Sequence, residues 1–362
     1  MVDDQNNNTN SSSNEVILLT NGFKHQSVPK SYIQPLEKRP TNIPPSLHYS
    51  YNTKHQNNTT PIINFQDGSD EEFDRADIIR QIFDAIQEFG FFQLINHGIN
   101  EEMMDEVMSL GKEFFEMPFE ERSKLYCDSR QTPLRVASSV MYEAEEVHYW
   151  RDSLRHACHP LEEFINAWPS KPAKYREVVG PYCVKMRALA LKLMELIAEG
   201  LGLKSNYFDD GDITGMQSMV VNHYPLCPDP SLTLGLPKHR DPNVITILTQ
   251  DVSGLQVLKD DEWMNVEPLP HAFVVFLGLQ MQVISNDKLR SADHRVLTNT
   301  TTARTTITTQ MSCTMECTMG PAKELLDEIN PAKYRHYKYQ DFFESYMAAS
   351  LDTDEALKHY KL

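Results

Sequence analysis

The chain after Met216 is divided into short runs of β-branched and aromatic residues, which Pro, Gly, Asn or Asp separate from one another. Closely spaced short strands of this kind are typical of a β-sandwich, a jelly roll or a barrel. We therefore expect an all-β second half. The expected strands are 217–224, 244–249, 255–258, 263–266, 272–277, 281–285, 294–298 and 305–311.

The half before Met216 has a different pattern. Through residues 172–201, apolar side chains recur at steps of three and four, which predicts a long helix with one stripe facing a core. Residues 126–160 are rich in Ser, Arg and Glu and show no such period, so we expect irregular structure there. The other elements expected in this half are helices at 70–89 and 100–116 and short strands at 61–65 and 90–95.

Charge and hydropathy exclude several classes of protein. The chain has 362 residues with 34 basic and 51 acidic side chains, a net charge of −17 that disfavours partners such as nucleic acid or an anionic membrane. Its mean hydropathy is −0.47, and no apolar run approaches the roughly 18 residues of a membrane span. The six Cys form no CxxC pair, and no secretory signal is visible. We therefore expect free thiols, a cytoplasmic location and neither nucleic-acid nor membrane partners.

Three residues form a candidate metal site. His239 and Asp241 are two apart, so in extended backbone their side chains point to the same side. His294 begins another expected strand. Two imidazoles and one carboxylate on one face form the ligand set of non-haem Fe(II) oxygenases, which leaves positions open for a co-substrate and O2. An isolated HxD pair is more often a turn or an ion pair, so this pattern alone is weak.

A second pair of residues strengthens the metal-site hypothesis. Arg304 and Thr306 follow His294 and face the same way if this segment is a strand. A planar guanidinium forks onto a carboxylate, and the hydroxyl adds a further donor. The pair is therefore a candidate receptor for the far carboxylate of a dicarboxylic keto acid.

Together, His239-x-Asp241, His294 and Arg304-x-Thr306 resemble the HxD…H…RxS signature of plant 2-oxoglutarate/Fe(II)-dependent dioxygenases. Two further runs resemble motifs of the same family in the correct order: GFFQLINHG at 90–98 and NHYPLCP at 222–228. Within the family, the runs at 149–152, 276–279 and 283–286 resemble the hyoscyamine 6-dioxygenase group.

The resemblance implies an α+β fold, in which a double-stranded β-helix (jelly-roll) core is flanked by helices and the N-terminal half is mainly helical. Residues 1–27, rich in Asn and Ser, are expected to be a disordered tail because they can bury little apolar surface. A mainly helical N-terminal domain with short strands is expected over 28–205, the jelly roll over 206–320 and C-terminal helices over 321–362.

The resemblance also implies a cofactor set and a ligand set. The cofactors are Fe(II), the co-substrates 2-oxoglutarate and O2, and ascorbate as reductant. Iron would be bound by His239, Asp241 and His294. The residues implied to contact 2-oxoglutarate are Arg304, Thr306, Asn222 and Tyr224.

Two positions depart from the family pattern, and two further histidines are not expected to bind the metal. Arg240 replaces a small residue between two ligands, and its side chain should point away from the metal. Thr306 replaces the usual Ser and keeps the hydroxyl. His97 is expected to be a structural turn residue, and His223 should face the opposite side of its strand from Tyr224.

The expected activity is oxidation, by default hydroxylation, of a small plant specialised metabolite with release of succinate and CO2 by a monomer. A tropane-type alkaloid is one candidate substrate, and a carboxylate at Glu143, Glu145 or Glu146 could pair with its cation. A phenylpropanoid, coumarin precursor, flavonoid or hormone would undergo the same chemistry. A non-catalytic jelly-roll binding protein, a cupin-type isomerase and a zinc hydrolase are alternatives, although the last two do not account for Arg304-x-Thr306.

Overall fold

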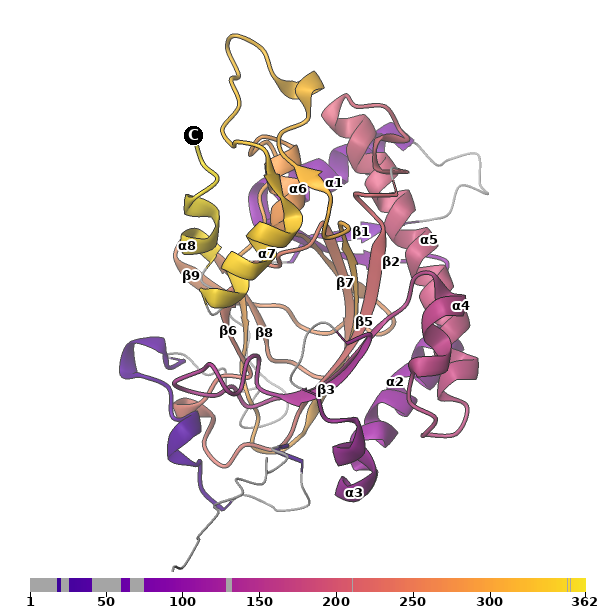
Figure 1. Cartoon of the computed structure of the whole chain (residues 1–362), viewed down its shortest axis with the longest axis vertical. Helices are drawn as coiled ribbons and strands as arrows, with labels where there is room; N and C mark the ends of the chain where they lie inside the picture. Colours follow the sequence, from indigo (N-terminus) through magenta and orange to yellow (C-terminus); the bar gives the residue numbers. More distant parts are fainter. Residues whose placement is uncertain are drawn as a thin grey trace, which may run out of the picture.

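The structure is a computed structural model, shown as a ribbon in Figure 1. The residues that it describes are 18–20, 26–40, 60–65, 75–127, 132–209, 211–349, 351 and 353–362.

Two β-sheets form the centre of the molecule. The larger sheet has eight strands, in the order β1 (Ile62–Asn64), β2 (Phe91–Ile95), β10 (Phe273–Leu277), β7 (Ile245–Gln250), β12 (Arg304–Ser312), β5 (Met216–Tyr224), β4 (Asp152–Ala157) and β3 (Leu134–Ser138). The smaller sheet has four strands, in the order β6 (Leu236–His239), β11 (His294–Val296), β8 (Leu255–Lys259) and β9 (Glu262–Asn265). A separate pair joins β13 (Thr318–Met319) and β14 (Tyr337–Lys338).

The long strands β5 and β12 place alternate side chains on opposite faces of the larger sheet. They pair antiparallel over their whole length, from Arg304 opposite Tyr224 to Ser312 opposite Met216. Their outer face packs on a helix, since a Cβ at Gly111 would lie 3.0 Å from Ile307 and 3.1 Å from Val221. The inner face is left for a cavity.

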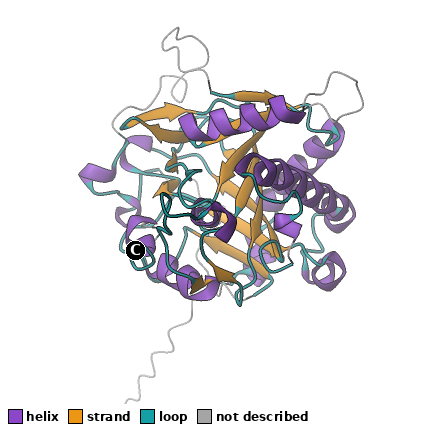
Figure 2. Cartoon of the chain, turned by 90° about the horizontal axis from the view of Figure 1, so that it is seen from above, coloured by secondary structure: helices purple, strands orange, loops and turns teal. Residues whose placement is uncertain are grey.

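Helices cover the outer face of the larger sheet (Figures 1 and 2). The covering helices are α1 (Arg75–Phe89), α2 (Glu101–Glu116) and α5 (Tyr175–Leu201), and the short ones are α3 (Phe119–Arg122), α4 (Leu161–Phe164) and α6 (Leu279–Ile284). The stripe predicted over 172–201 is confirmed, because Val179, Met186 and Leu193 of α5 are completely buried. The C-terminal helices α7 (Tyr339–Ala348) and α8 (Thr353–Lys358) lie beside the smaller sheet, and Tyr346 Oη donates to the Arg240 carbonyl at 2.8 Å.

The α+β jelly-roll prediction is confirmed, but two local predictions were wrong. Residues 281–285 were expected to form a strand, yet residues 281–284 belong to α6, whose side chains are all buried, and Ser285 is the residue that follows this helix. A short apolar run without a period does not distinguish a buried strand from a buried helix. Residues 126–160, expected to be irregular, contain β3 and β4. These strands extend the larger sheet along the edge of β5.

The chain near the N-terminus contacts the sheet. Most of the tail predicted over 1–27 lies outside the described residues, but Leu18 and Leu19 are described and buried. The backbone N–H groups of Leu19 and Thr20 donate to the Asp152 carboxylate at 3.0 and 2.8 Å. The tail prediction therefore does not extend to these residues.

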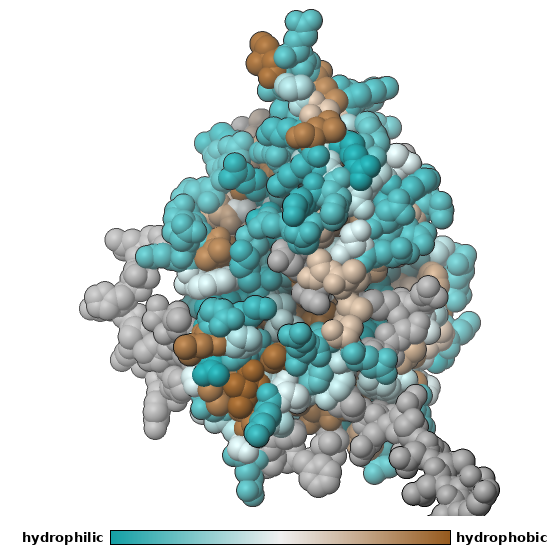
Figure 3. All heavy atoms as spheres, turned by 60° about the vertical axis from the view of Figure 1, so that its left-hand side comes forward, coloured by the Kyte–Doolittle hydropathy of each residue, from teal (hydrophilic) through white to brown (hydrophobic). Residues whose placement is uncertain are grey.

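Hydrophilic residues cover most of the face shown in Figure 3. In the described part of the chain, no helix combines the length and the hydropathy that a membrane span requires.

Gly278 fixes how the chain leaves β10, and its replacement should destabilise the fold. A Cβ at this position would lie 1.9 Å from the Asn243 carbonyl oxygen, and the Leu279 N–H donates to the Asp241 carbonyl at 2.8 Å. Backbone would have to move, so we expect Gly278→Ala to lower the free energy of unfolding by about 1–3 kcal/mol, the usual cost of overpacking. Urea unfolding measures this.

Gly211→Ala is the matched control, because no atom lies within 4 Å of a Cβ there. Equal unfolding midpoints for the two variants would contradict the steric role of Gly278.

Candidate active site

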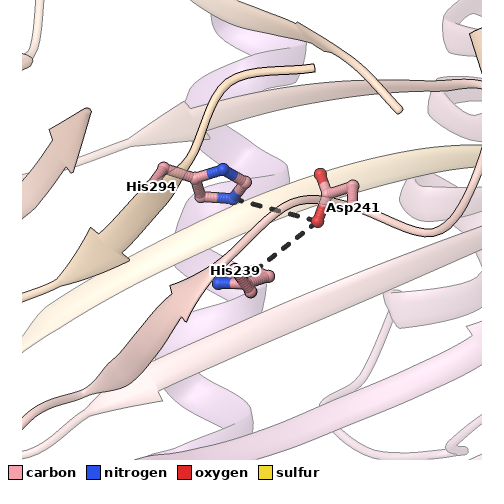
Figure 4. A group of neighbouring side chains, drawn as sticks. All are labelled: His239, Asp241 and His294. Carbon is pink, nitrogen blue, oxygen red and sulfur yellow. Dashed lines mark ion pairs between the residues drawn. The ribbon is translucent and has the colours of Figure 1, made fainter. Parts of the chain in front are cut away.

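The structure brings the three predicted metal ligands together (Figure 4). His239 ends β6 and His294 begins β11, and the two are direct cross-strand partners. Asp241 lies two residues beyond the end of β6. Its Oδ1 atom is 3.6 Å from His239 Nε2 and 3.8 Å from His294 Nε2. One ligand atom from each residue lies within 4.8 Å of the others, and all three side chains are buried.

Backbone carbonyls orient both imidazoles. His239 Nδ1 lies 2.9 Å from the Pro237 oxygen, and His294 Nδ1 lies 3.1 Å from the Ala292 oxygen. Because a carbonyl only accepts, each Nδ1 carries the proton and each Nε2 keeps a free lone pair. Phe276 also stacks on the His294 ring at a centroid distance of 4.4 Å. Such partners are typical of metal-ligating histidines.

The protonation states of His294 and Asp241 also suit the binding of a metal ion. Burial and the neighbouring His239 lower the pKa of His294 to about 4. Burial would raise the pKa of Asp241, but a hydrogen bond with His239 and the nearby His294 outweigh it and lower the pKa to about 2. At neutral pH the site therefore presents a neutral imidazole and a carboxylate, the forms that bind metals.

Arg304 at the start of β12 has one side-chain nitrogen without a partner. Its Nε donates to the Val252 carbonyl at 3.0 Å, and its Nη2 donates to Gln250 Oε1 at 2.7 Å. Its Nη1 is buried and has no hydrogen-bond partner among the described residues. The guanidinium carbon lies 5.2 Å from the centre of the Tyr224 ring. An unsatisfied buried donor is costly, so Nη1 indicates a position for an anionic acceptor.

Asn222 and Thr306 are placed beside Arg304 by strand register. They are cross-strand partners of β5 and β12, and Asn222 Nδ2 donates to Thr306 Oγ1 at 3.2 Å. Tyr224 occupies the corresponding position opposite Arg304. These four side chains and the three candidate ligands line one cavity of about 210 Å³.

The residues present fit both implied groups. Two imidazoles and a carboxylate favour a metal such as Fe(II), and no Cys is found among the described residues that line the cavity. The free Nη1 of Arg304, with the Thr306 hydroxyl nearby, fits the far carboxylate of a keto diacid.

Arginines on the neighbouring strands also line the cavity, and the sequence analysis missed them. Arg151 donates to Asn222 Oδ1 at 3.0 Å and to the Ser139 carbonyl at 2.7 Å. Arg135 and Arg155 face the same cavity from β3 and β4. Arg151, Ser153 and Arg155 follow one another at steps of two, and this period was an available signal of a strand.

Three residues set aside as non-ligands lie away from the candidate metal ligands. Arg240 Nη2 donates to Asp293 Oδ2 at 3.0 Å, and Arg240 does not line the cavity. His97 Nε2 donates to the His271 carbonyl at 2.8 Å, in a turn. His223 stacks on Phe115 at 4.9 Å on the opposite face of β5, as predicted.

The acidic residues suggested as partners for a cationic substrate do not line the cavity. Glu143 and Glu146 are exposed. Glu145 Oε1 instead accepts the backbone N–H groups of Val140 and Met141, at 3.1 and 2.7 Å.

Two family models match the chain. Residues 215–312 match the 2OG-Fe(II) oxygenase superfamily. Residues 60–171 match the N-terminal region described as non-haem dioxygenase in morphine synthesis.

Individual proteins resemble the chain over nearly its whole length. Hyoscyamine 6-dioxygenase of Hyoscyamus niger is 42% identical over 94% of this chain and 98% of its own. Protein DOWNY MILDEW RESISTANCE 6 of Arabidopsis thaliana is 39% identical over 95% of this chain and 98% of its own. The crystal structure of JOX2 with 2OG, Fe and JA superposes with a TM-score of 0.81 at 30% identity, over 96% of this chain and 98% of that one. The chain therefore belongs to the plant 2-oxoglutarate- and Fe(II)-dependent dioxygenases, and it is an oxidoreductase.

Proposed function

We propose that the chain hydroxylates a small plant specialised metabolite, with 2-oxoglutarate converted to succinate and CO2. In this proposal His239, Asp241 and His294 hold Fe(II). The 2-oxoglutarate is bound by Arg304, Thr306, Asn222 and Tyr224. The observation that carries the proposal is the buried Nη1 of Arg304, which has no partner among the described residues and lies in the same cavity as the three converging candidate ligands.

When bound by these residues, Fe(II) with 2-oxoglutarate and O2 would supply the oxidising chemistry for a C–H bond. The residues of the chain hold the metal, the keto acid and the substrate in position. Its two imidazoles are held with Nε2 toward Asp241 by the carbonyls of Pro237 and Ala292. Arg304 binds the far carboxylate and so fixes how deeply the keto acid enters. Residues of α7, among them Tyr339 and Phe343, line the same cavity and would exclude water from the substrate.

Which specialised metabolite the chain oxidises is also a matter of proposal. The similarity to hyoscyamine 6-dioxygenase favours a tropane alkaloid, whereas the similarity to flavanone 3-dioxygenase 2 of Oryza sativa, 41% identical over 80% of this chain, favours a flavonoid. A phenylpropanoid, a coumarin precursor or a hormone would undergo the same chemistry. Of the described residues that line the cavity, Asp241 alone is acidic. This favours a neutral or anionic substrate over a cation. Ascorbate as reductant, a monomeric state and a cytoplasmic location complete the proposal.

A substrate panel tests this function. The chain is incubated with Fe(II), ascorbate, 2-oxoglutarate and O2, together with a tropane alkaloid, a flavanone, a coumarin precursor or a phenylpropanoid acid. We expect one class to stimulate succinate formation and to yield a product heavier by one oxygen atom.

Succinate that forms without Fe(II), or no succinate under any condition, would contradict the proposal. The second result would favour a non-catalytic binding protein.

A further inference from the structure

The cavity wall formed by β3 and β4 carries two arginines that have no part in binding the metal or the keto acid. Arg135 and Arg155 are direct cross-strand partners, so their side chains leave the same face of the sheet. Both line the cavity. The same face therefore presents two positive charges to whatever occupies the cavity.

Strand register places Arg155 next to the keto-acid site but outside it. Asn222 of β5 is opposite Thr306 on one side and Ser153 of β4 on the other. Arg155 is two residues beyond Ser153, and it is opposite Val220. Side chains two residues apart on a strand are neighbours on one face, about 7 Å apart. Arg155 therefore faces the part of the cavity that is left for the organic substrate.

Arg155 lacks an anionic partner in the described part of the chain. No carboxylate lies within ion-pair distance of it, and burial and the charge of Arg135 both lower its pKa. Arg135 itself donates to the carbonyl oxygens of Cys127 and Val140. Like charges directly opposite each other destabilise a sheet, and a charge removed from water requires a partner. A bound anion would remove both penalties.

The other residues that line the cavity indicate what kind of molecule carries the anionic group. Asp241, the one acidic residue among the described lining residues, belongs to the metal site. Apolar side chains line much of the remaining space, among them Val220, Leu248, Phe343 and Leu351, together with the polar side chains of Thr308, Gln310 and Ser312. Such a cavity suits a molecule with an apolar body and one acidic end.

We propose that Arg155, supported by Arg135, binds the carboxylate of the organic substrate, so that this dioxygenase acts on a small organic acid with an apolar body. The inference rests on the proposed function and adds the substrate class. A guanidinium forms two parallel hydrogen bonds with a carboxylate and thereby fixes its orientation. With its carboxylate bound at Arg155, the substrate would extend its apolar body through the cavity toward the candidate metal ligands.

Matched probes test the inference. Benzoate, phenylacetate and cinnamate, the corresponding amides, and benzylamine are titrated by calorimetry into the chain loaded with Fe(II) and 2-oxoglutarate in the absence of O2. We expect at least one acid to bind about 10–150-fold more tightly than its amide, as charge-assisted hydrogen bonds allow. Arg155→Gln should abolish this preference for acid over amide. Arg155→Lys, which keeps the charge without the fork, should retain part of it.

Arg187→Gln is the matched control. Arg187 is a half-buried arginine of α5 that donates to the Thr214 carbonyl and does not line the cavity. The inference is overturned if no acid binds better than its amide, if benzylamine is preferred, or if Arg187→Gln removes the preference as fully as Arg155→Gln. If Arg155→Gln does not fold, wild type is compared with Arg155→Lys instead. An equal preference for acid over amide in these two proteins then overturns the inference.

A separate readout distinguishes failure of this inference from failure of the proposed function. Wild type without any organic substrate is assayed for slow formation of succinate from 2-oxoglutarate. If succinate forms while acids show no preference, only the substrate class is wrong. If no succinate forms under any condition, the proposed function fails, and the substrate inference that rests on it fails too.

Discussion

Replacing His294 with Ala should abolish succinate formation and iron binding together. The change removes one of the three proposed ligands, whose ligand atoms lie within 4.8 Å of one another. Loss of a partner outside the ligand shell alone typically costs 10–100-fold in metal affinity, so loss of a ligand should cost more than about 100-fold. Iron retained after gel filtration and the rate of succinate formation measure the two effects.

The control is His223→Ala, which removes another largely buried imidazole. His223 is on β5 and packs on Phe115, and it does not line the cavity. This variant should lose stability yet still bind iron. Iron retained by His294→Ala, or lost equally from both variants, would mean that His294 is not a ligand.

Replacing Arg304 with Gln should raise the KM for 2-oxoglutarate by about 10–150-fold. A hydrogen bond to a charged group contributes about 1.5–3 kcal/mol, which corresponds to that range. The free Nη1 would be lost, while the glutamine amide could still satisfy the acceptor on Gln250 that Nη2 now contacts at 2.7 Å. Initial rates of succinate formation at varied 2-oxoglutarate concentration give the value.

Arg295→Gln provides the comparison for Arg304. Arg295 is also buried, but it donates to Gln256 Oε1 and lies 4.0 Å from the centre of the Trp263 ring, outside the cavity. Its replacement should leave the KM for 2-oxoglutarate near the wild-type value. A KM that rises equally in both variants would indicate general loosening of the core rather than loss of a carboxylate receptor.

The sequence allowed the candidate ligands to be chosen because the relevant spacings are local. His239 and Asp241 are two residues apart, and so are Arg304 and Thr306, which places each pair on one face of extended backbone. The pairing of His239 with His294 could not be derived in this way. It depends on which strands of the smaller sheet become neighbours, and that is determined by packing between distant segments.

The parts that were missed have physical reasons. The apolar run in α6 is buried on every side, so it has no period that separates helix from strand. The strands β3 and β4 include charged residues, and Arg155 and Arg135 look like surface positions in the sequence. Only the folded structure, in which the two residues are cross-strand partners, shows that they line a cavity. For the same reason, the sequence directed attention to Glu145 as a substrate partner, although backbone N–H groups already occupy its carboxylate.

The most direct test of the central claim is anaerobic titration of the metal-free chain with Fe(II) and then with 2-oxoglutarate, followed by visible absorption. The convergence of His239, Asp241 and His294 beside Arg304 predicts one Fe(II) per chain and a charge-transfer band that appears only when both are bound. Asp241→Asn, nearly equal in shape, should lose the band. A band that persists in this variant, or a wild-type chain that shows no band at saturating Fe(II) and 2-oxoglutarate, would contradict the assignment of this site.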